Sequence, residues 1–367
     1  MTSSFLVPPS QIQGKLDELW NTKDGKNKVR ASLFNIIFFI KNASPREEYI
    51  RKITSKLVEK FPARIFLISS DPTNSENSLK TAVSVMTTEQ GEYSLTCDLI
   101  EISATGKGEE QVPFILLPNI IPDLPVFLIW TEDPGAGNAL CETLKSFATR
   151  IIFDSESAED LCLFAQSVLK IGQDTNSEIA DLNWARLESW RDIVATTFSD
   201  SDKLETLKQT THVTITYNSH ETPFFCHTKI QSIYLQAWLA SCLKWVPDPK
   251  SRALDLKRFV YSFKGTPIEV ELKEVRNSSL PPGMILSLNL EMTGGFEFLF
   301  ERNLVELHQV TLKHFTKDSC FLPSQFMISK GESGQSLIKE ICHKGTSSHY
   351  KSVLQLISHW SVGISCC

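Results

Sequence analysis

The residues of this chain that could perform chemistry are scattered, and a glycine-rich turn is the clearest grouping among them. Gly135-Ala136-Gly137-Asn138-Ala139-Leu140 follows an apolar, strand-like run and precedes a helical pattern, which is the context of a phosphate-binding loop. Leu140 stands where a third glycine would be, and no Lys-Ser/Thr pair follows. A plain connection between strand and helix is therefore expected. The alternative is a sugar-phosphate- or nucleotide-binding α/β enzyme that uses the Gly135-Ala136-Gly137 loop.

Potential metal ligands come close together at three places along the sequence, and two of these groups contain both histidine and cysteine. These are His220 with Cys226 and His227, His308 with His314, and Cys342 with His343 and His349. None of the three has the spacing of a structural zinc site, and the sequence contains neither a His-Glu-x-x-His helix nor a Gly-x-Ser-x-Gly elbow. We therefore expect no metal, no cofactor and no catalytic residue in this chain.

The nine cysteines form no Cys-x-x-Cys pair, and their number is odd. Scattered thiols of this kind are typical of a reduced, intracellular compartment. Cys366 and Cys367 are expected to lie on an exposed tail without function, although terminal cysteines can carry a lipid or act as redox thiols. The free thiols leave open a redox partner.

Composition excludes several classes of function. Of the 367 residues, 41% are hydrophobic and 22% are charged, which predicts a soluble globular protein with two cores. A formal net charge of −6 gives no attraction for polyanions, so neither nucleic acid nor a membrane surface is an expected partner. The apolar segment 112–130 is interrupted by four prolines and by Asp123, which argues against a membrane helix. The first residues lack a basic leader, so a cytoplasmic location is expected.

Strand-like and helix-like runs alternate in the first half and predict an α/β domain over residues 1–174. Buried strands are expected at residues 32–40, 64–69, 125–130 and 150–153, and helices at 45–60, 139–149 and 157–169. Residues 81–88 and 93–103 are expected to form a hairpin that turns at Glu89-Gln90-Gly91. The pattern predicts a mostly parallel sheet with an antiparallel extension, flanked by helices.

A turn-rich segment at residues 172–177 separates this domain from a second one, predicted over residues 175–367. Residues 178–198 are predicted to form one amphipathic helix, and residues 230–245 a buried helix. Strands are expected at 211–217, 259–263, 268–275, 284–292 and 296–300, the last two joined through Gly294-Gly295. The second domain is thus predicted to be α+β, with antiparallel strands and buried helices, in a two-domain α/β protein.

Several motifs, in order along residues 30–245, resemble those of the bacterial glucose-6-phosphate dehydrogenase assembly protein (OpcA) family. They are Arg30-Ala31-Ser32-Leu33-Phe34-Asn35, Phe61-Pro62-Ala63-Arg64-Ile65, the proline-rich segment 112–134 followed by Arg150-Ile151-Ile152-Phe153-Asp154-Ser155, and Asp181-Leu182-Asn183-Trp184-Ala185-Arg186-Leu187 with Trp190-Arg191. Phe61 replaces the usual histidine of the family, and no motif aligns after Trp245.

The resemblance implies a non-catalytic accessory protein that promotes the oligomeric assembly and activity of glucose-6-phosphate dehydrogenase. That enzyme is the NADP-dependent entry point of the oxidative pentose phosphate pathway. The implied partner is therefore the dehydrogenase, and the implied role is that of an allosteric activator in carbohydrate metabolism.

The chemistry of the motif residues suggests which of them contact a partner. Trp184, Arg186 and Arg191 fall away from the helical face of Trp190, and Trp and Arg are enriched at protein contacts. The alternative for these three residues is a contact between the two domains. Trp190 itself is expected in the core.

The remaining partner-binding candidates are Arg30, Arg64 and Asp123. The two arginines directly precede buried strands, and their alternative role is a surface ion pair or a helix cap. Asp123 either caps backbone groups within a proline-rich scaffold or faces a crevice with the carboxyl ends of neighbouring strands.

Overall fold

The structure is a computed structural model that describes residues 4–22, 32–42, 44, 46–90, 93–248, 257–328 and 334–360. These residues form eleven α-helices and two eight-stranded sheets, and the predicted α/β class is confirmed. The chain divides into two compact units. The first comprises Met1–Ser157, Lys170–Asp181 and Leu337–Gly345, and the second comprises Ala158–Leu169, Leu182–Ser336 and Thr346–Cys367.

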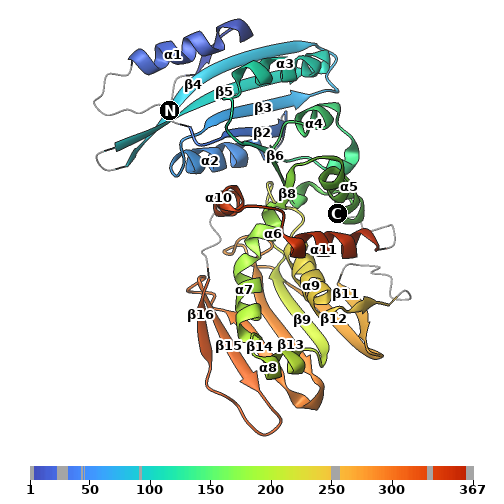
Figure 1. Ribbon diagram of the computed structural model, residues 1–367. Helices are drawn as coiled ribbons and strands as arrows, with labels where there is room; N and C mark the ends of the chain where they lie inside the picture. Colours follow the sequence, from blue (N-terminus) through green and yellow to red (C-terminus); the bar gives the residue numbers. More distant parts are fainter. Residues whose placement is uncertain are drawn as a thin grey trace. The chain divides into compact units, whose positions relative to one another are not determined.

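The sheet of the first unit has the strand order β1-β4-β5-β3-β2-β6-β7-β8 (Figure 1). Its strands are β1 (Phe5–Leu6), β2 (Asn35–Lys41), β3 (Arg64–Asp71), β4 (Ser78–Gln90), β5 (Tyr93–Thr105), β6 (Val126–Trp130), β7 (Arg150–Phe153) and β8 (Glu178–Asp181). The six neighbouring strands β5, β3, β2, β6, β7 and β8 run parallel to one another. Strand β4 forms an antiparallel hairpin with β5, and β1 pairs antiparallel with β4. A parallel sheet with an antiparallel extension is therefore confirmed.

Strand β6 is apolar along its whole length, as expected for a strand of a parallel sheet that helices cover on both faces. Every residue of β6 and β7 is buried. The helices that belong wholly to this unit are α1 (Ile12–Thr22), α2 (Glu47–Val58), α3 (Val112–Leu116) and α4 (Ala139–Leu144). Helix α2 lies within the helix predicted over residues 45–60, and its buried side chains Tyr49, Ile50, Ile53 and Leu57 recur at helical spacing. Helices α5 (Leu161–Asp174) and α10 (Gln335–Cys342) each contribute a part.

The prediction of one helix over residues 178–198 is wrong. Glu178–Asp181 forms β8, which pairs in parallel with β7, and two short helices follow, α6 (Leu182–Arg186) and α7 (Glu188–Thr197). The carboxylate of Asp181 accepts hydrogen bonds from Ser155 N and Oγ at 2.9 and 3.1 Å, which holds the end of β8 beside the segment after β7. Residues 178–181 form a strand because the N–H and C=O groups at the edge of β7 need hydrogen-bond partners, and β8 supplies them. The spacing of apolar residues carries no information about this pairing. Helix α5 also runs five residues beyond its predicted end at residue 169.

The second unit contains a mostly antiparallel sheet with the order β10-β11-β12-β9-β13-β14-β15-β16. Its strands are β9 (Thr210–Asn218), β10 (Val246–Pro247), β11 (Arg258–Phe263), β12 (Thr266–Val275), β13 (Ile285–Met292), β14 (Glu297–Arg302), β15 (Gln309–Phe315) and β16 (Ser324–Met327). Only the β9–β12 pair is parallel in this sheet. The hairpin through Gly294 and Gly295 is confirmed, with φ of 82° and 81° that suit glycine. The sequence patterns did not indicate β15 and β16.

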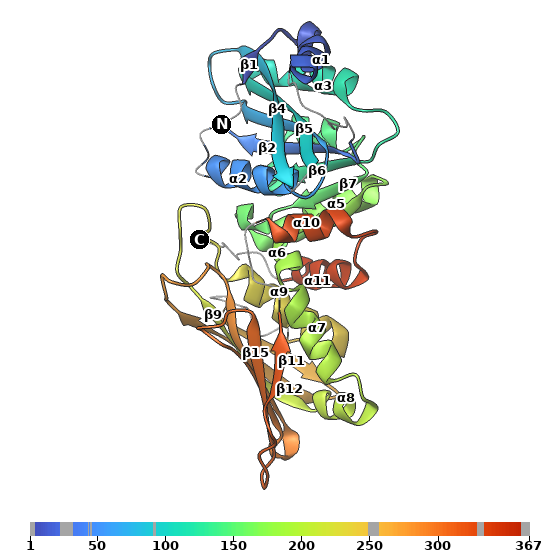
Figure 2. The ribbon, with the colours of Figure 1, turned by 90° about the vertical axis from the view of Figure 1, so that its left-hand side faces the viewer.

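The helices of the second unit lie on one face of this sheet. They are α6, α7, α8 (Ser201–Leu207), α9 (Ile230–Leu243) and α11 (Ser348–Ser358). Figure 2 shows α7, α8 and α11 on the same side of the strands. Helix α9 is buried on almost all sides, as predicted, and Lys244 ends it in the left-handed conformation (φ 56°). On β13, Leu288 and Leu290 are buried while Glu291 is exposed, so the strand alternates between an apolar and a polar face.

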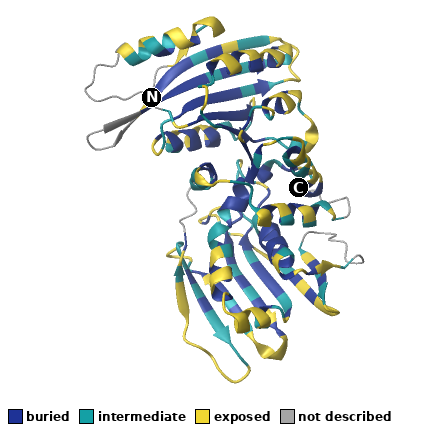
Figure 3. Cartoon of the chain, viewed as in Figure 1, coloured by how far each residue is buried: buried dark blue, intermediate teal, exposed yellow. Residues whose placement is uncertain are grey.

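Buried residues concentrate in the strands of both sheets and in α9 (Figure 3). In the first unit Phe39 and Trp130 stack at 3.9 Å between ring centroids, on the neighbouring strands β2 and β6. Trp190 is 2% exposed, so its predicted place in the core is confirmed. No helix of the described ranges is long and apolar enough to cross a membrane.

Candidate functional site

Asn35 begins β2 and holds the proline-rich loop that leads into β6. Its Nδ2 donates to Ile121 O at 3.0 Å, and Ile121 N donates back to Asn35 Oδ1 at 2.9 Å. The side chain is fully buried. A buried carboxamide that both donates and accepts fixes a loop whose prolines cannot donate for themselves. The Asn35 motif therefore has a structural explanation.

Arg64 begins β3 and is bound within the same unit. Its Nε and Nη2 donate to Asp98 Oδ2 at 3.1 and 2.7 Å, and its Nη1 donates to Asn119 O at 2.9 Å. Asp98 Oδ1 accepts a further hydrogen bond from Trp20 Nε1 at 2.7 Å. Arg64 is only 7% exposed, so its guanidinium stabilises the segment before β6 instead of facing solvent. Arg30 lies outside the described residues.

Asp123 is exposed in the loop held by Asn35 and has a left-handed backbone, with φ of 64°. The loop lies at the amino ends of β2 and β6, because Asn35 N donates to Pro125 O. Asp123 is therefore at the opposite edge of the sheet from the carboxyl ends of these strands. Aspartate tolerates this conformation better than most residues because its short side chain bonds locally.

Trp184, Arg186 and Arg191 lie together in the second unit. The guanidinium of Arg191 is 3.6 Å from the centroid of the Trp184 ring, and its Nη1 donates to Trp184 O at 2.6 Å. Arg186 lies 5.1 Å from the Phe225 ring and donates to Asn183 Oδ1 at 2.6 Å. Trp184 is buried, whereas both arginines are half-buried. The tryptophan therefore positions Arg191, and the arginines keep part of their surface accessible.

Arg150, the first residue of β7, carries a contact that residue spacing did not reveal. Its side chain is 1% exposed, forms ion pairs with Glu178 and Glu340, and donates to the carbonyl oxygens of His343 and Gly345. Arg150 opens one of the family-like motifs, and that motif was the only signal for it in the sequence. At the other end of β7, buried Asp154 accepts a hydrogen bond from Arg46.

The Gly135-Ala136-Gly137 loop uses its own groups to satisfy most of its backbone. Gly135 N donates to Asp133 Oδ1, and Ala136 N donates to Asp133 O. The Oδ1 of Asn138 accepts from Leu140 N and Cys141 N at 2.8 and 3.0 Å and thereby caps the six-residue helix α4. These N–H groups are the ones a phosphate would need, so the geometry favours the plain connection between strand and helix.

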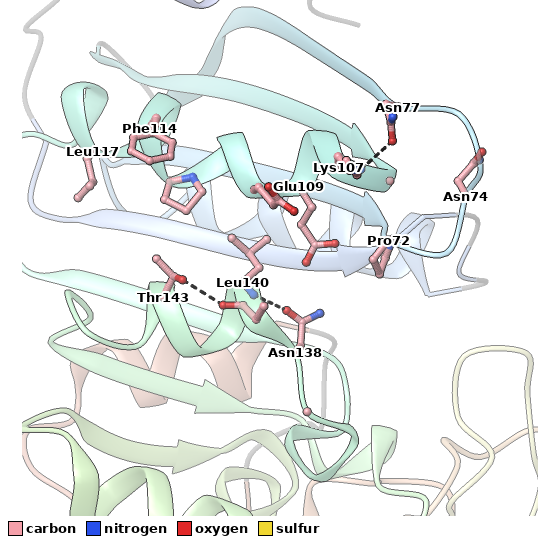
Figure 4. Close-up of a pocket in the computed structure, with 15 residues that line it drawn as sticks. Pro72, Asn74, Asn77, Lys107, Glu109, Phe114, Leu117, Asn138, Leu140 and Thr143 are labelled. Atoms are coloured by element: carbon pink, nitrogen blue, oxygen red, sulfur yellow. Dashed lines mark hydrogen bonds between the residues drawn. The ribbon is translucent and has the colours of Figure 1, made fainter.

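A cavity of about 760 Å³ opens beside α4 at the carboxyl ends of strands β3, β5 and β6 (Figure 4). Three segments surround it. They are the loop after β3 with Pro72, Asn74 and Asn77, the stretch after β5 with Gly106, Lys107, Glu109, Glu110, Pro113, Phe114 and Leu117, and the start of α4 with Gly137, Asn138, Ala139, Leu140 and Thr143. The carboxyl edge is where open α/β sheets commonly bind ligands. Residue spacing did not reveal this cavity because its walls are far apart in sequence.

A thiol and an imidazole meet in the second unit. Cys242 Sγ of α9 lies 3.6 Å from His349 Nδ1 of α11. Partial burial raises the pKa of the Cys242 thiol, although Ser241 and the charge of Arg191 act in the opposite direction. The thiol is therefore mostly protonated at neutral pH and is not an activated nucleophile.

The fold and the buried motif residues define a two-unit α/β protein whose distinctive side chains hold its backbone. The chain matches two family models described as domains of a glucose-6-phosphate dehydrogenase subunit, the N-terminal domain over residues 54–167 and the C-terminal domain over residues 177–354. It belongs to the OpcA family of glucose-6-phosphate dehydrogenase assembly proteins, and the resemblance of the motifs is confirmed.

Curated relatives come from cyanobacteria. The chain is 28% identical over 203 residues to a protein of Nostoc punctiforme named as a proposed OxPP cycle protein OpcA. The matched region covers 53% of this chain and 41% of that protein. A Synechocystis protein of the same name is 28% identical over 157 residues, which covers 42% of this chain and 30% of that protein. The chain thus spans about two fifths or less of the length of these relatives.

Solved structures resemble this chain only distantly. The UDP-N-acetylglucosamine 3-dehydrogenase GnnA of Acidithiobacillus ferrooxidans has a TM-score of 0.46 and 9% sequence identity, over 89% of this chain and 96% of that chain. A likeness this distant says nothing about what this chain binds.

Proposed function

We propose that this chain is a non-catalytic accessory protein that binds glucose-6-phosphate dehydrogenase in the cytoplasm and promotes its oligomeric assembly and activity. The observation that carries the proposal is the match of both halves of the chain to family models named for a subunit of that dehydrogenase. The relatives named for the OxPP cycle support the same metabolic setting.

The geometry of the motif residues supports an accessory role. Asn35, Arg64 and Arg150 bind backbone carbonyls or carboxylates of their own unit. Residues that are bound in this way stabilise the scaffold, and we expect partner recognition to fall to the surface of that scaffold. A binding protein stabilises whichever state of its partner it binds more tightly. If this chain binds the assembled dehydrogenase more tightly than the separate subunits, it shifts the dehydrogenase toward the active oligomer.

The proposed partner-binding residues differ in how they can act. Arg186 and Arg191 keep accessible surface in the second unit, and Asp123 is exposed in the first. Trp184 is buried and would act by holding the guanidinium of Arg191. Arg64 would act only through the loop that it anchors, while Arg30 remains a proposal on sequence grounds.

The test combines activity with hydrodynamics. Purified chain is titrated into glucose-6-phosphate dehydrogenase while the rate of NADPH formation and the sedimentation coefficient of the enzyme are followed. Both are expected to rise and saturate at a fixed ratio of the two proteins. Unchanged activity and unchanged sedimentation across the titration would contradict the proposal.

Two matched variants locate the contact. Arg186→Ala should weaken binding by about tenfold or more, since arginines at the centre of interfaces commonly contribute that much. Arg258→Ala is the control, because Arg258 has a side-chain exposure of 78% and lies on β11, outside the motifs. If the two variants bind the dehydrogenase equally well, the contact does not include Arg186.

The alternative of a sugar-phosphate- or nucleotide-binding enzyme lacks a supporting observation at the Gly135-Ala136-Gly137 loop. Gly135 N, Leu140 N and Cys141 N already donate to side chains of the same segment. Calorimetric titration of the chain alone with glucose 6-phosphate, ATP and NADP⁺ distinguishes the two functions, because tight binding that depends on phosphate would favour the enzyme.

A further inference from the structure

The cavity beside α4 has an apolar side that is not covered by other parts of the first unit. Pro113, Phe114 and Leu117 of the α3 region line it together with Ala139 and Leu140 of α4. Figure 4 shows Phe114 and Leu117 on a different wall from Leu140. Phe114 is 77% exposed and Leu117 is 49% exposed. Large apolar side chains left open beside a cavity indicate a surface that binds something flat and apolar.

Part of the lining is polar and is supplied by asparagine side chains. Three asparagines each use their Oδ1 to accept from the backbone, Asn74 from Glu76 N, Asn77 from Lys107 N, and Asn138 from Leu140 N and Cys141 N. An asparagine whose oxygen is engaged has its orientation fixed, and its Nδ2 group remains as the donor. Asn74, Asn77 and Asn138 all line the cavity, so their amides are its candidate hydrogen-bond donors.

Two carboxylates supply acceptors. Glu109 is 8% exposed, lines the cavity, and accepts a hydrogen bond from buried Ser70 Oγ at 2.8 Å. Glu110 beside it is exposed. Lys107 is the only lysine or arginine among the described residues that line the cavity. The lining thus carries more negative than positive charge, which favours hydroxyl or amino groups in the occupant over phosphate.

We propose that this cavity binds a nucleoside, with its base against Phe114 and Leu140. The edge of the base accepts hydrogen bonds from the asparagine amides, and the ribose hydroxyls donate to Glu109 or Glu110. Aromatic side chains bind bases through their faces, and carboxylates commonly bind ribose hydroxyls. A phosphate attached to the nucleoside stays outside, because Asn138 occupies the N–H groups at the start of α4. The inference does not depend on the partner of the chain.

The experiment uses the purified chain and four probes, adenosine, AMP, glucose and inorganic phosphate, in calorimetric titrations. Adenosine is expected to bind saturably, AMP to bind no more tightly than adenosine, and glucose and phosphate not to bind. Absence of adenosine binding overturns the proposal. So does AMP binding tenfold tighter than adenosine, which would show a phosphate site, and so does saturable binding of glucose without adenosine, which would show a carbohydrate site.

Three variants tie binding to this cavity. Phe114→Ala should weaken adenosine binding about tenfold, as expected for loss of an aromatic face. Ala139→Trp places a large ring in the cavity from an exposed position and should abolish binding. Phe321→Ala is the control, because Phe321 is 48% exposed in the second unit. Thermal unfolding checks that each variant is folded. Adenosine binding that survives Ala139→Trp unchanged in a folded protein would place the nucleoside elsewhere and overturn the proposal.

Discussion

Arg150 and Glu340 form an ion pair although 190 residues separate them in the sequence. Arg150 begins β7, and Glu340 lies in α10, whose segment Leu337–Gly345 belongs to the first unit. The same guanidinium donates to the carbonyl oxygens of His343 and Gly345. One buried side chain therefore joins a late segment of the chain to the sheet built by its first half.

Replacing Arg150 should release this late segment. Arg150→Met removes the guanidinium that pairs with Glu340 and donates to two carbonyl groups, so the free energy of unfolding should fall by about 3–5 kcal/mol. Urea unfolding measures the loss, and hydrogen exchange should increase in residues 337–345. Lys344→Ala is the control, since Lys344 is exposed in the same segment. Unchanged exchange in Arg150→Met would show that other contacts hold the segment.

Asp123 allows a backbone role to be separated from a role in partner binding. Its φ of 64° is unfavourable for alanine, so Asp123→Ala should destabilise the chain by roughly 1 kcal/mol, whereas Asp123→Gly should be neutral or stabilising. Asp123→Asn keeps a residue that tolerates this conformation and removes only the charge. If Asp123→Asn binds the dehydrogenase like the unchanged chain, the carboxylate makes no contact with the partner.

The thiols should differ in reactivity. Burial raises the pKa of Cys97 to about 11 and that of Cys141 to about 12, so neither forms appreciable thiolate at pH 8. Iodoacetamide should label Cys226, Cys320 and Cys342, which are exposed, well before the buried Cys97, Cys141 and Cys162. Cys242 should react more slowly than the other exposed thiols, because partial burial raises its pKa.

Peptide mass spectrometry of the labelled protein follows each thiol, and labelling in denaturant is the control in which all of them react. Equal rates for Cys141 and Cys320 in the folded protein would contradict the burial of Cys141. A redox partner would act on the fast-reacting set, so the same experiment states which thiols such a partner can reach. Cys366 and Cys367 lie outside the described residues.

His314 should make stability depend on pH. Its ring stacks between Phe298 and Phe321, at 4.1 and 4.5 Å between centroids, and burial together with the charge of Lys203 lowers its pKa below the ordinary 6.5. The unfolded chain takes up this proton near pH 6.5 and the folded chain only at lower pH. The free energy of unfolding therefore falls as the pH decreases below 6.5.

His314→Phe keeps an aromatic ring in the stack and removes the titration. The melting temperature of the variant relative to the unchanged chain should be higher at pH 5 than at pH 8. Other titrating groups are common to both proteins and cancel in the comparison. An equal difference at the two pH values would mean that His314 does not contribute to the pH dependence.

Local patterns predicted most strands and helices because they depend on neighbours in the sequence. The buried strands at residues 64–71 and 126–130, the β4–β5 hairpin and the buried helix α9 all follow from runs of apolar residues and turn signals. The helix predicted over residues 178–198 failed because Ile179 and Leu182 fit helical spacing as well as they fit a strand followed by a helix. Pairing with β7 decided between them.

The domain boundary between residues 174 and 175 stays a prediction. Both Lys170–Asp181 and Leu337–Gly345 belong to the first compact unit. Limited proteolysis would test the boundary, since an exposed linker there should be cut first.

The sequence by itself determined the α/β class, the alternation of apolar runs that builds both sheets, and the motifs that show the family. Tertiary structure decided which motif side chains are buried. Arg64 and Trp184 look like surface residues in sequence, but Asp98, Asn119 and Tyr350 enclose them in their units. It also decided that segments 72–77, 106–117 and 137–143 surround one cavity. The physical reason is that burial and hydrogen-bond partners depend on how distant segments meet, and residue spacing encodes only local geometry.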